Sequence, residues 1–271
     1  GAADYISKPI KPAILLARVN THLRLKEASD FLRDENAVLE RKVAERTSQL
    51  SIVQDVVIMA MASLAETRDN ETGNHIRRTQ NYVKALATKL GEHPKYRDTL
   101  TPENIELLYK SAPLHDIGKV GVPDHILLKP GKLEAAEWEE MKRHAAYGYD
   151  AIVAAEKQLP EPQSFLQFGR EIARGHHERW EGGDYPDGIA GDDIPLSARL
   201  MAIADVYDAL ISRRVYKPPY PHETAVDLIR EGRGTHFDPE LVDAFLAVED
   251  EFVAIAKRFA DDEKTDEGDD E

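Results

Sequence analysis

The sequence has no cysteine among its 271 residues. Disulfides and thiolate metal ligands are therefore excluded, so a metal site in this chain has to use histidine and carboxylate side chains. Such nitrogen and oxygen donors suit iron, manganese, zinc or nickel, and they do not suit copper(I) or iron–sulfur clusters.

Long hydrophobic runs are missing too. No uninterrupted apolar stretch suggests a membrane span, and no signal peptide opens the chain. We therefore expect a cytoplasmic protein with no membrane partner. The 42% of hydrophobic and 31% of charged residues are typical of a soluble, mostly helical protein with one substantial core.

Positive charge is scarce, since 35 lysines and arginines face 50 acidic residues and leave a net charge of −15. This balance argues against binding to a nucleic-acid polymer. Residues 261–271 contain eight acidic residues and one lysine, a net charge of −7, and are expected to form a disordered tail. The remainder is only moderately acidic, so a small anionic ligand stays compatible with it.

What the sequence does contain is a spaced series of metal-ligating residue types around His115-Asp116, in the run LHDIGK. Adjacent His and Asp side chains can bind one ion, and the second carboxylate oxygen can bridge to a neighbouring ion. Lys119 follows Asp116 by three residues, so on a helix it shares that face and can reach a bound phosphate. The other candidate ligands are Glu71, His75, His144, His176, His177 and Asp205. Together they predict a polynuclear metal site for phosphate-ester hydrolysis.

Taken one at a time, these residues have ordinary alternatives. Glu71 and His75 are spaced for one helical turn, but they also fit a capping carboxylate and an exposed histidine. The adjacent His176 and His177 are a stronger signal, because neighbouring imidazoles repel each other when protonated. Asp205 follows an apolar run, where a buried carboxylate needs a partner or a metal ion.

The periodicity of apolar residues predicts an all-α fold. Helical patterns cover residues 55–68, 73–90, 101–117, 134–157, 164–178, 196–211, 221–231 and 238–259. Cap-Pro-Glu patterns at Thr101 and Asp238 mark two helix starts. Gly- and Pro-rich loops separate several of the segments, notably at 129–132 and 181–195.

A heptad pattern begins at Leu25, and no proline or glycine interrupts residues 13–70. One seam carries Leu25, Leu32, Leu39, Arg46, Val53 and Ala60, and the other carries Ser29, Asn36, Val43, Leu50, Val57 and Leu64. The pattern favours a parallel coiled-coil homodimer, with Asn36 as a register-setting polar residue and Arg46 as a flaw. The alternative is an amphipathic helix that packs on its own domain.

Residues 1–28 resemble the last strand and helix of a response-regulator receiver domain, in which a Lys-Pro pair, here Lys8-Pro9, ends the final strand. The phospho-accepting aspartate is missing, so this fragment should not be phosphorylated, and a cognate histidine kinase would act only through the absent part. We predict a coiled-coil linker over 29–54, a catalytic domain over 55–260 and the acidic tail over 261–271.

A second resemblance covers the region from about Val56 to Phe245. Its motifs are Glu71-x-x-x-His75, His115-Asp116-x-x-Lys119, His144, His176-His177-Glu178, Gly182-Gly183-Asp184-Tyr185-Pro186 and Ile203-Ala204-Asp205-Val206-Tyr207-Asp208. These resemble, in the same order, the motifs of HD-GYP domains, the helical phosphodiesterases that hydrolyse bacterial cyclic dinucleotides, chiefly cyclic di-GMP. The resemblance implies a metal site made of His75, His115, Asp116, His144, His176, His177 and Asp205.

The same resemblance implies two or three divalent ions, iron or manganese before zinc or nickel, bridged by Asp116. Glu71 matches a ligand of the members with a third ion. Water activated by these ions would attack the phosphodiester, giving pGpG or GMP. Lys119, Tyr185, Asp208 and the pair Arg214 and Lys217 would contact the substrate, and Asp208 would also orient a ligand or Lys119. Tyr185 would either stack on a guanine or donate a hydrogen bond to a phosphate. Without the family context, Arg214 and Lys217 are better read as a solvated basic face.

The chain departs from the family where the glycine of Gly-Tyr-Pro is replaced by Asp184. Aspartate tolerates a positive φ angle better than most residues, so the loop is expected to keep its shape. The loop is also where the family meets GGDEF-domain proteins, so that contact is more in question than hydrolysis. Two alternatives stay open: a hydrolase for another nucleotide, such as a mixed cyclic dinucleotide or a phosphomonoester, and a catalytically inactive dinucleotide sensor or scaffold.

Overall fold

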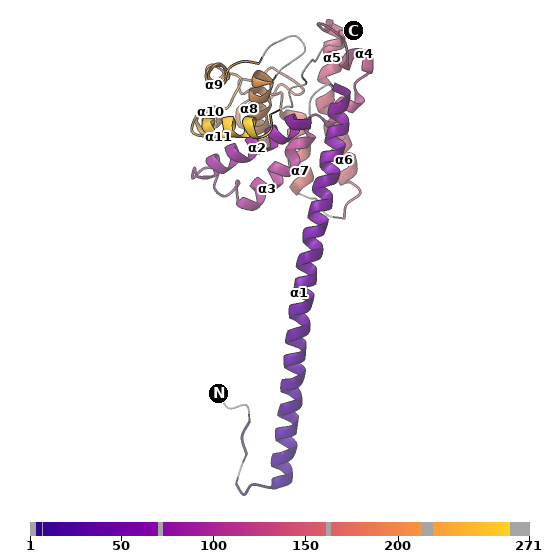
Figure 1. Ribbon diagram of the computed structural model, residues 1–271, viewed down its shortest axis with the longest axis vertical. Coiled ribbons are helices and arrows are strands. Elements are labelled where there is room, and N and C mark those ends of the chain that lie inside the picture. Colours follow the sequence, from indigo (N-terminus) through magenta and orange to yellow (C-terminus); the bar gives the residue numbers. More distant parts are fainter. Residues whose placement is uncertain (1–3, 7, 70–72, 161–163, 213–218, 261–271) are drawn as a thin grey trace, which may run out of the picture. The chain divides into compact units, whose positions relative to one another are not determined.

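The computed structural model describes residues 4–6, 8–69, 73–160, 164–212 and 219–260. In these ranges every regular element is a helix, apart from one isolated bridge between Arg233 and Phe237 (Figure 1). The prediction of an all-α fold is confirmed. The chain divides into two compact units, Gly1–Val56 and Val57–Glu271.

The first unit consists mainly of helix α1, which runs from Pro12 to Asp69 and ends in the second unit. Its apolar seam residues are solvent-exposed: Leu25, Leu32, Leu39, Val43 and Leu50 each keep more than half of their surface in water. An apolar stripe of this kind can be buried only when a second helix or another element packs against it.

Helix α1 also bears on the expectation that no segment of the chain spans a membrane. It holds an 18-residue window with a mean hydropathy of 1.4, which is long and apolar enough to cross a membrane by length and composition alone. Core helices of water-soluble proteins meet the same criterion. In this chain Ile58, Ala62 and Ala65 at the end of α1 are buried in the second unit, where Ile58 packs with Leu114 and Ile152.

The second unit contains the remaining helices. They are α2 (Gly73–Gly91), α3 (Pro102–Ser111), η1 (Ala112–Leu114), η2 (Ile117–Gly121), α4 (Asp124–Leu127), α5 (Ala135–Lys142), α6 (His144–Glu156), α7 (Ser164–Gly175), η3 (Gly191–Asp193), α8 (Leu196–Ile211), α9 (His222–Glu231), α10 (Pro239–Leu246) and α11 (Glu249–Arg258). Helix α2 packs against α3, α8, α10 and α11, and α7 packs against α3, α6 and α8. In Figure 1, α9 to α11 gather on one side of this unit and α4 to α6 on the other.

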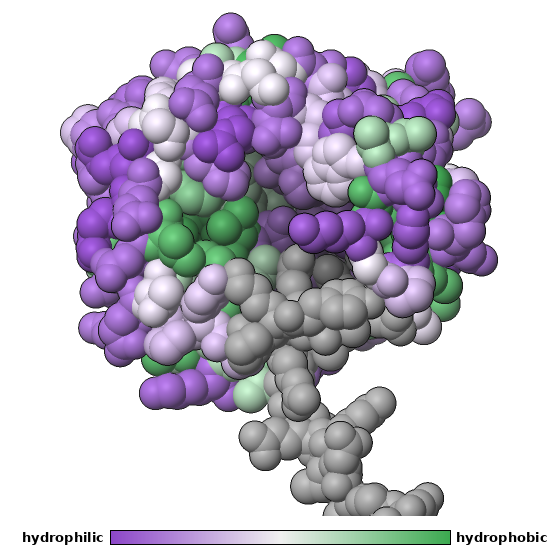
Figure 2. Space-filling view, turned by 90° about the horizontal axis from the view of Figure 1, so that it is seen from above, coloured by the Kyte–Doolittle hydropathy of each residue, from purple (hydrophilic) through white to green (hydrophobic). Residues whose placement is uncertain are grey.

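The main core is built around aromatic side chains of α2, α8, α10 and α11. Tyr82 stacks on Phe252 with ring centroids 4.4 Å apart, and Tyr207 meets Phe252 edge to face at 5.0 Å. Such pairs stabilise a core beyond the area that they bury. Outside, hydrophilic residues cover most of the face seen in Figure 2, and apolar residues gather mainly in a hollow. The core thus fixes α2 and α8, which carry part of the site.

Several helices begin and end where the sequence predicted, and others do not. Thr101 accepts a hydrogen bond from the Asn104 amide, and Asp238 accepts one from the Glu240 amide, as the capping patterns predicted. The expected helix 101–117 ends at Ser111 and continues as a 3-10 turn, because Pro113 has no N–H to donate. The expected helices 134–157 and 238–259 each divide in two, and the short helix α4 was not predicted.

A close contact between two glycines joins η2 to α6. A Cβ atom on Gly118 would lie 1.9 Å from the carbonyl oxygen of His144 and 2.4 Å from the amide nitrogen of Gly148. The backbones can therefore approach this closely only without side chains. Since η2 follows His115-Asp116 and α6 begins at His144, this contact brings three of the candidate ligands together.

Candidate metal centre

The candidate ligands stand at helix ends or on buried helix faces. His75 lies in the first turn of α2, and His115 and Asp116 join η1 to η2. His144 is the first residue of α6, and Asp205 lies on α8. His176 and His177 directly follow α7. Glu71, Arg214 and Lys217 lie outside the described residues.

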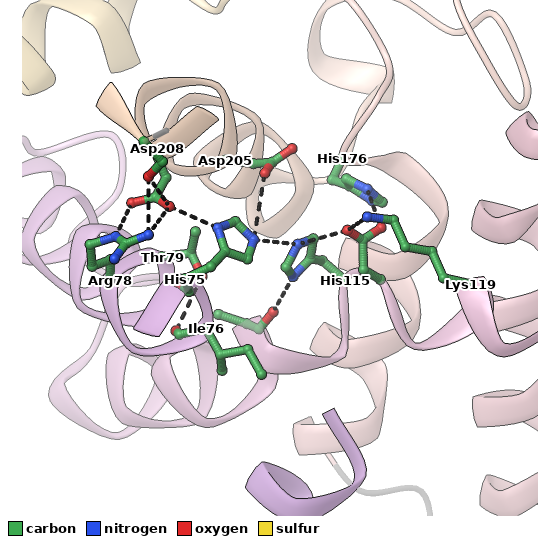
Figure 3. Close-up of polar contacts among 12 residues, drawn as sticks. His75, Ile76, Arg78, Thr79, His115, Lys119, His176, Asp205 and Asp208 are labelled. Carbon is green, nitrogen blue, oxygen red and sulfur yellow. Dashed lines mark hydrogen bonds and ion pairs between the residues drawn. The ribbon is translucent and has the colours of Figure 1, made fainter. Parts of the chain in front are cut away.

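These segments converge on two adjoining groups of donor atoms. One group contains Asp116, His144, His176 and His177, and the other contains His75, His115 and Asp205. Within each group the donor atoms lie within 4.8 Å of one another. In Figure 3, the side chains of His75 on α2, Asp205 on α8 and His115 point toward one another. The described part of the chain thus offers two sites with at least three protein ligands each.

Backbone carbonyls orient three of the imidazoles. Nδ1 of His115 lies 3.1 Å from the Ala112 oxygen, Nδ1 of His144 lies 2.8 Å from the Met141 oxygen, and Nδ1 of His176 lies 2.9 Å from the Ile172 oxygen. A carbonyl can only accept, so in each ring Nδ1 carries the proton. Nε2 of the neutral ring is then left with a lone pair, as a metal ligand requires.

His75 is oriented in the same way by a carboxylate, because its Nδ1 lies 2.8 Å from Oδ2 of Asp208. Its Nε2 then lies only 3.3 Å from Nε2 of His115. Two unprotonated nitrogens at this distance would repel each other, so the arrangement needs either an added proton or a cation that both can bind. Nε2 of His75 also lies 3.8 Å from Oδ1 of Asp205, which supplies a negative oxygen donor to the same point.

Asp116 connects the two groups. Its Oδ1 lies 3.3 Å from Nε2 of His144 and 3.7 Å from Nε2 of His176, whereas its Oδ2 lies 3.3 Å from Nε2 of His115 and 2.8 Å from Nζ of Lys119. Burial alone would raise the pKa of this carboxyl, but the charge of Lys119, followed by the contacts with His115 and His176, holds it well below its usual range. The group is therefore an anion.

The donor set fits divalent metal ions. Oδ1 of Asp116 and Nε2 of His144 are buried and make no hydrogen bond within the described part of the chain, although they lie 3.3 Å apart. Unpaired polar atoms are costly in a protein interior unless an ion satisfies them. Burial lowers the pKa of His144 to about 4 and also lowers that of His177, so both rings are neutral at pH 7 and able to bind an ion. The imidazole and carboxylate donors thus form a site for divalent metal ions.

Arg78 is a residue that the sequence analysis missed. Its Nε donates to Oδ1 of Asp208 at 2.6 Å and its Nη2 donates to Oδ2 at 2.9 Å, and Nη2 also donates to Ser212 Oγ at 3.0 Å. The fork of two parallel bonds fixes the carboxylate that orients His75. Asp208 therefore contacts His75 and not Lys119, and only 1% of its side chain is exposed, which leaves no room for substrate. Arg78 lies three residues after His75, the one sequence signal for its role.

Replacing Arg78 by alanine should lower the free energy of unfolding by about 3 kcal/mol or more, because the buried Asp208 would keep its charge without its main partner. Affinity for metal should fall as well, since His75 would have to stay protonated to compensate. Urea denaturation and metal titration would measure both effects. Arg230→Ala is the matched control, because Arg230 pairs with Asp227 on the surface, where a loss below about 1 kcal/mol is expected. Equal stability of the two variants would contradict this role.

The Asp184-Tyr185-Pro186 loop lies beside the first donor group. The Tyr185 ring centroid is 4.7 Å from that of His177 and 6.2 Å from that of His144. Oε1 of the buried Glu178 accepts hydrogen bonds from the amides of Asp187, at 2.7 Å, and Gly188, at 3.1 Å, and so ties the loop to the residue after His177. Burial raises the pKa of Tyr185, which keeps its hydroxyl protonated and able to donate.

The protein family described as the HD domain matches residues 59–241 of this chain. The chain belongs to the HD domain family. A protein of Vibrio cholerae named "probable cyclic di-GMP phosphodiesterase" is 55% identical over 97% of this chain and 60% of its own length. A Xanthomonas campestris protein named "cyclic di-GMP phosphodiesterase response regulator RpfG" is 35% identical over 96% of this chain and 65% of its own.

A third relative carries a different name. The Vibrio cholerae protein named "3'3'-cGAMP-specific phosphodiesterase 2" is 40% identical over 76% of this chain and 37% of its own length. The chain therefore spans between about a third and two thirds of the length of these curated relatives.

Proposed function

We propose that the chain is an HD-GYP phosphodiesterase that hydrolyses cyclic di-GMP to pGpG, GMP or both. The observation that carries the proposal is the pair of adjoining donor groups, linked through His115 and Asp116 and bordered by Tyr185. Two ions held side by side can bind the attacking and the leaving oxygen of a phosphodiester. The names of two relatives similar over nearly the whole chain support cyclic di-GMP as the substrate.

When bound, divalent ions supply Lewis-acid charge and make water a nucleophile near neutral pH. Asp116 contacts members of both donor groups and so sets their spacing. Nζ of Lys119, held 2.8 Å from Asp116, places an ammonium where charge develops on the phosphate oxygens. In the reaction, a P–O bond forms to water and the bond to the ribose 3′-oxygen breaks, and that oxygen takes up a proton. The protonated Tyr185 can donate to a phosphate oxygen.

A second substrate is favoured by one observation, which is the similarity to the relative named as specific for 3′3′-cGAMP. That mixed dinucleotide offers the same two phosphodiesters as cyclic di-GMP and differs only in one base. The metal centre cannot distinguish the two, so discrimination has to come from side chains that contact the bases.

The test is to load the purified chain with Mn²⁺ or Fe²⁺ under anaerobic conditions and to incubate it with each dinucleotide. We expect two or three ions per chain, conversion of cyclic di-GMP to pGpG or GMP, and loss of turnover after chelation. Faster hydrolysis of 3′3′-cGAMP would show that this dinucleotide is the preferred substrate, and the proposed reaction would stay the same. If the chain has its full metal content and binds cyclic di-GMP without hydrolysing it, the protein is instead a sensor or scaffold.

We also infer that residues 1–28 are the end of a receiver domain and that the chain is the output part of a response regulator. The printed name of the Xanthomonas relative, which aligns with 96% of this chain, supports the inference. A histidine kinase would then act through the rest of the receiver domain, and GGDEF-domain proteins would be possible partners at the Tyr185 loop. Mass spectrometry of phosphoryl transfer to a chain extended at its N-terminus would test the kinase link.

A further part of the proposal is that α1 pairs with α1 of a second copy in a parallel coiled coil. The exposed seam of Leu25, Leu32, Leu39, Val43 and Leu50 supports it. Light scattering should give twice the chain mass of 30.4 kDa. Leu32→Glu with Leu39→Glu should shift the protein to monomer, because charges at these positions would face each other. The control is Arg33→Glu, which lies outside both seams, and a monomeric wild type would overturn the dimer.

A further inference from the structure

Helix α5 places a large exposed aromatic side chain next to the metal centre. Trp138 is 46% exposed, and its ring meets that of Tyr185 edge to face with centroids 6.1 Å apart. Tyr185 in turn lies 4.7 Å from the ring of His177, a member of the first donor group. Only one aromatic ring therefore separates the indole from the candidate ligands.

Lys142 follows Trp138 by one helical turn, so the two side chains share a face of α5. Its ammonium lies over the Tyr185 ring, 5.9 Å from the centroid. It also pairs with Oε1 of Glu139 at 2.7 Å, but the Glu139 side chain is 71% exposed, so water and salt screen this pair strongly. The ammonium can therefore leave Glu139 and contact an anionic ligand at a small cost in free energy.

The Trp138 indole is not part of the hydrophobic core. No residue of α5 is fully buried, and the helix is attached to the domain through Met141 and through Leu133, which pack against Val122, Ile126 and Leu127. The amide of Glu134 donates to the Glu137 side chain at 2.7 Å and fixes the start of the helix. The His144 bond to the Met141 oxygen fixes its end relative to the metal centre. Helix α5 is thus a rigid support for an aromatic ring that faces water.

We propose that Trp138 and Lys142 form a base platform, on which a purine base of the nucleotide stacks while its phosphate lies at the metal centre. An exposed indole offers the large flat surface that bases bind, and the neighbouring ammonium favours a phosphate or the acceptor atoms of a guanine. Stacking was expected of Tyr185, but that ring is already packed against His177 and Trp138. The platform deepens the proposed function and rests on it for the identity of the nucleotide.

A binding experiment tests the platform without any turnover. The chain has two tryptophans, so in a Trp180→Phe variant only Trp138 emits. Titration with GMP should quench this emission to saturation, because a stacked guanine quenches indole, whereas ribose 5-phosphate should leave it unchanged. Emission that does not respond to GMP, or that responds equally to ribose 5-phosphate, would overturn the platform even in a chain that hydrolyses cyclic di-GMP.

A kinetic experiment separates stacking from a structural role. Trp138→Ala should raise KM for cyclic di-GMP by about five- to a hundredfold and leave kcat within a few-fold, because a stacked base contributes binding in both ground and transition states. Trp138→Phe should restore most of the affinity. Lys142→Ala should also raise KM, and Lys132→Ala, an exposed lysine before α5, should not. An unchanged KM in Trp138→Ala, or a fall in kcat that phenylalanine does not rescue, would contradict the proposal. If the wild-type chain hydrolyses no cyclic di-GMP, the proposed reaction is wrong. The fluorescence titration would then still test whether a base stacks on Trp138.

Discussion

Replacing Asp116 by alanine is expected to abolish hydrolysis and to reduce the metal content of both donor groups, while the helical fold is retained. Among the described residues, Asp116 contacts His115 of one group through Oδ2 and His144 and His176 of the other through Oδ1. Without its negative charge, the first group would keep imidazoles alone and the second only Asp205 as a carboxylate, so both would bind ions less tightly. Loss of several kcal/mol of transition-state stabilisation corresponds to a rate at least about a thousandfold lower.

Elemental analysis, product chromatography and far-ultraviolet circular dichroism would measure the three parts of this prediction separately. Asp116→Asn keeps the volume of the side chain and removes its charge, so it should behave like the alanine variant. Asp227→Asn is the control, since this exposed aspartate pairs with Arg230 in its own helix turn and lies outside the donor groups. Normal metal content together with normal turnover in Asp116→Ala would rule out the bridging role.

Gly118→Ala is expected to be the most damaging single-methyl change in the domain. The new Cβ would lie 1.9 Å from the His144 carbonyl oxygen and 2.4 Å from the Gly148 nitrogen, and both are backbone atoms that cannot rotate away. Helix α6 would have to move off η2, which separates His144 from Asp116. Overpacking commonly costs 1–3 kcal/mol, and here we expect about 3 kcal/mol or more, or a melting temperature lower by about 6–12 °C.

The matched control for Gly118 is Gly169→Ala in the interior of α7. A Cβ there would meet only the ends of the Leu114 and Ile152 side chains, at 3.0 Å and 3.8 Å, which can adjust. Alanine also favours the helix over glycine by about 1 kcal/mol, so this variant should be close to neutral. Calorimetry and metal titration of the two variants give the comparison. If both melt alike, the close contact between η2 and α6 is not what holds the ligands in place.

Much of the fold could be predicted from local sequence. Apolar periodicity and the caps at Thr101 and Asp238 located most helices, because these signals act over a few residues. The break between α5 and α6 could not be foreseen. It depends on a hydrogen bond from the His144 side chain to the Met141 carbonyl oxygen. In a continuous helix, that oxygen would accept from a backbone amide of the next turn. Nothing in the local pattern shows that His144 turns back in this way.

The site divides along similar lines. The motif spacing named the residues of the two donor groups, but it did not reveal which of them lie in the same group. It missed Arg78, which acts through Asp208 from 130 residues away, and Trp138, which gains a role only through contact with Tyr185. Both contacts join segments whose separation along the chain carries no information about their distance in space.

By itself, then, the sequence determined the chemistry of this protein: no thiolate ligands, a series of histidines and carboxylates, and helices on which to place them. Only the tertiary structure decided the arrangement. The packing of α2 on α8 brings Asp208 to Nδ1 of His75, and the glycine contact between η2 and α6 brings Asp116 to His144. The physical reason is that side-chain type is a local property, whereas the tautomer of an imidazole and the sharing of an ion depend on atoms that only folding brings within a few ångströms.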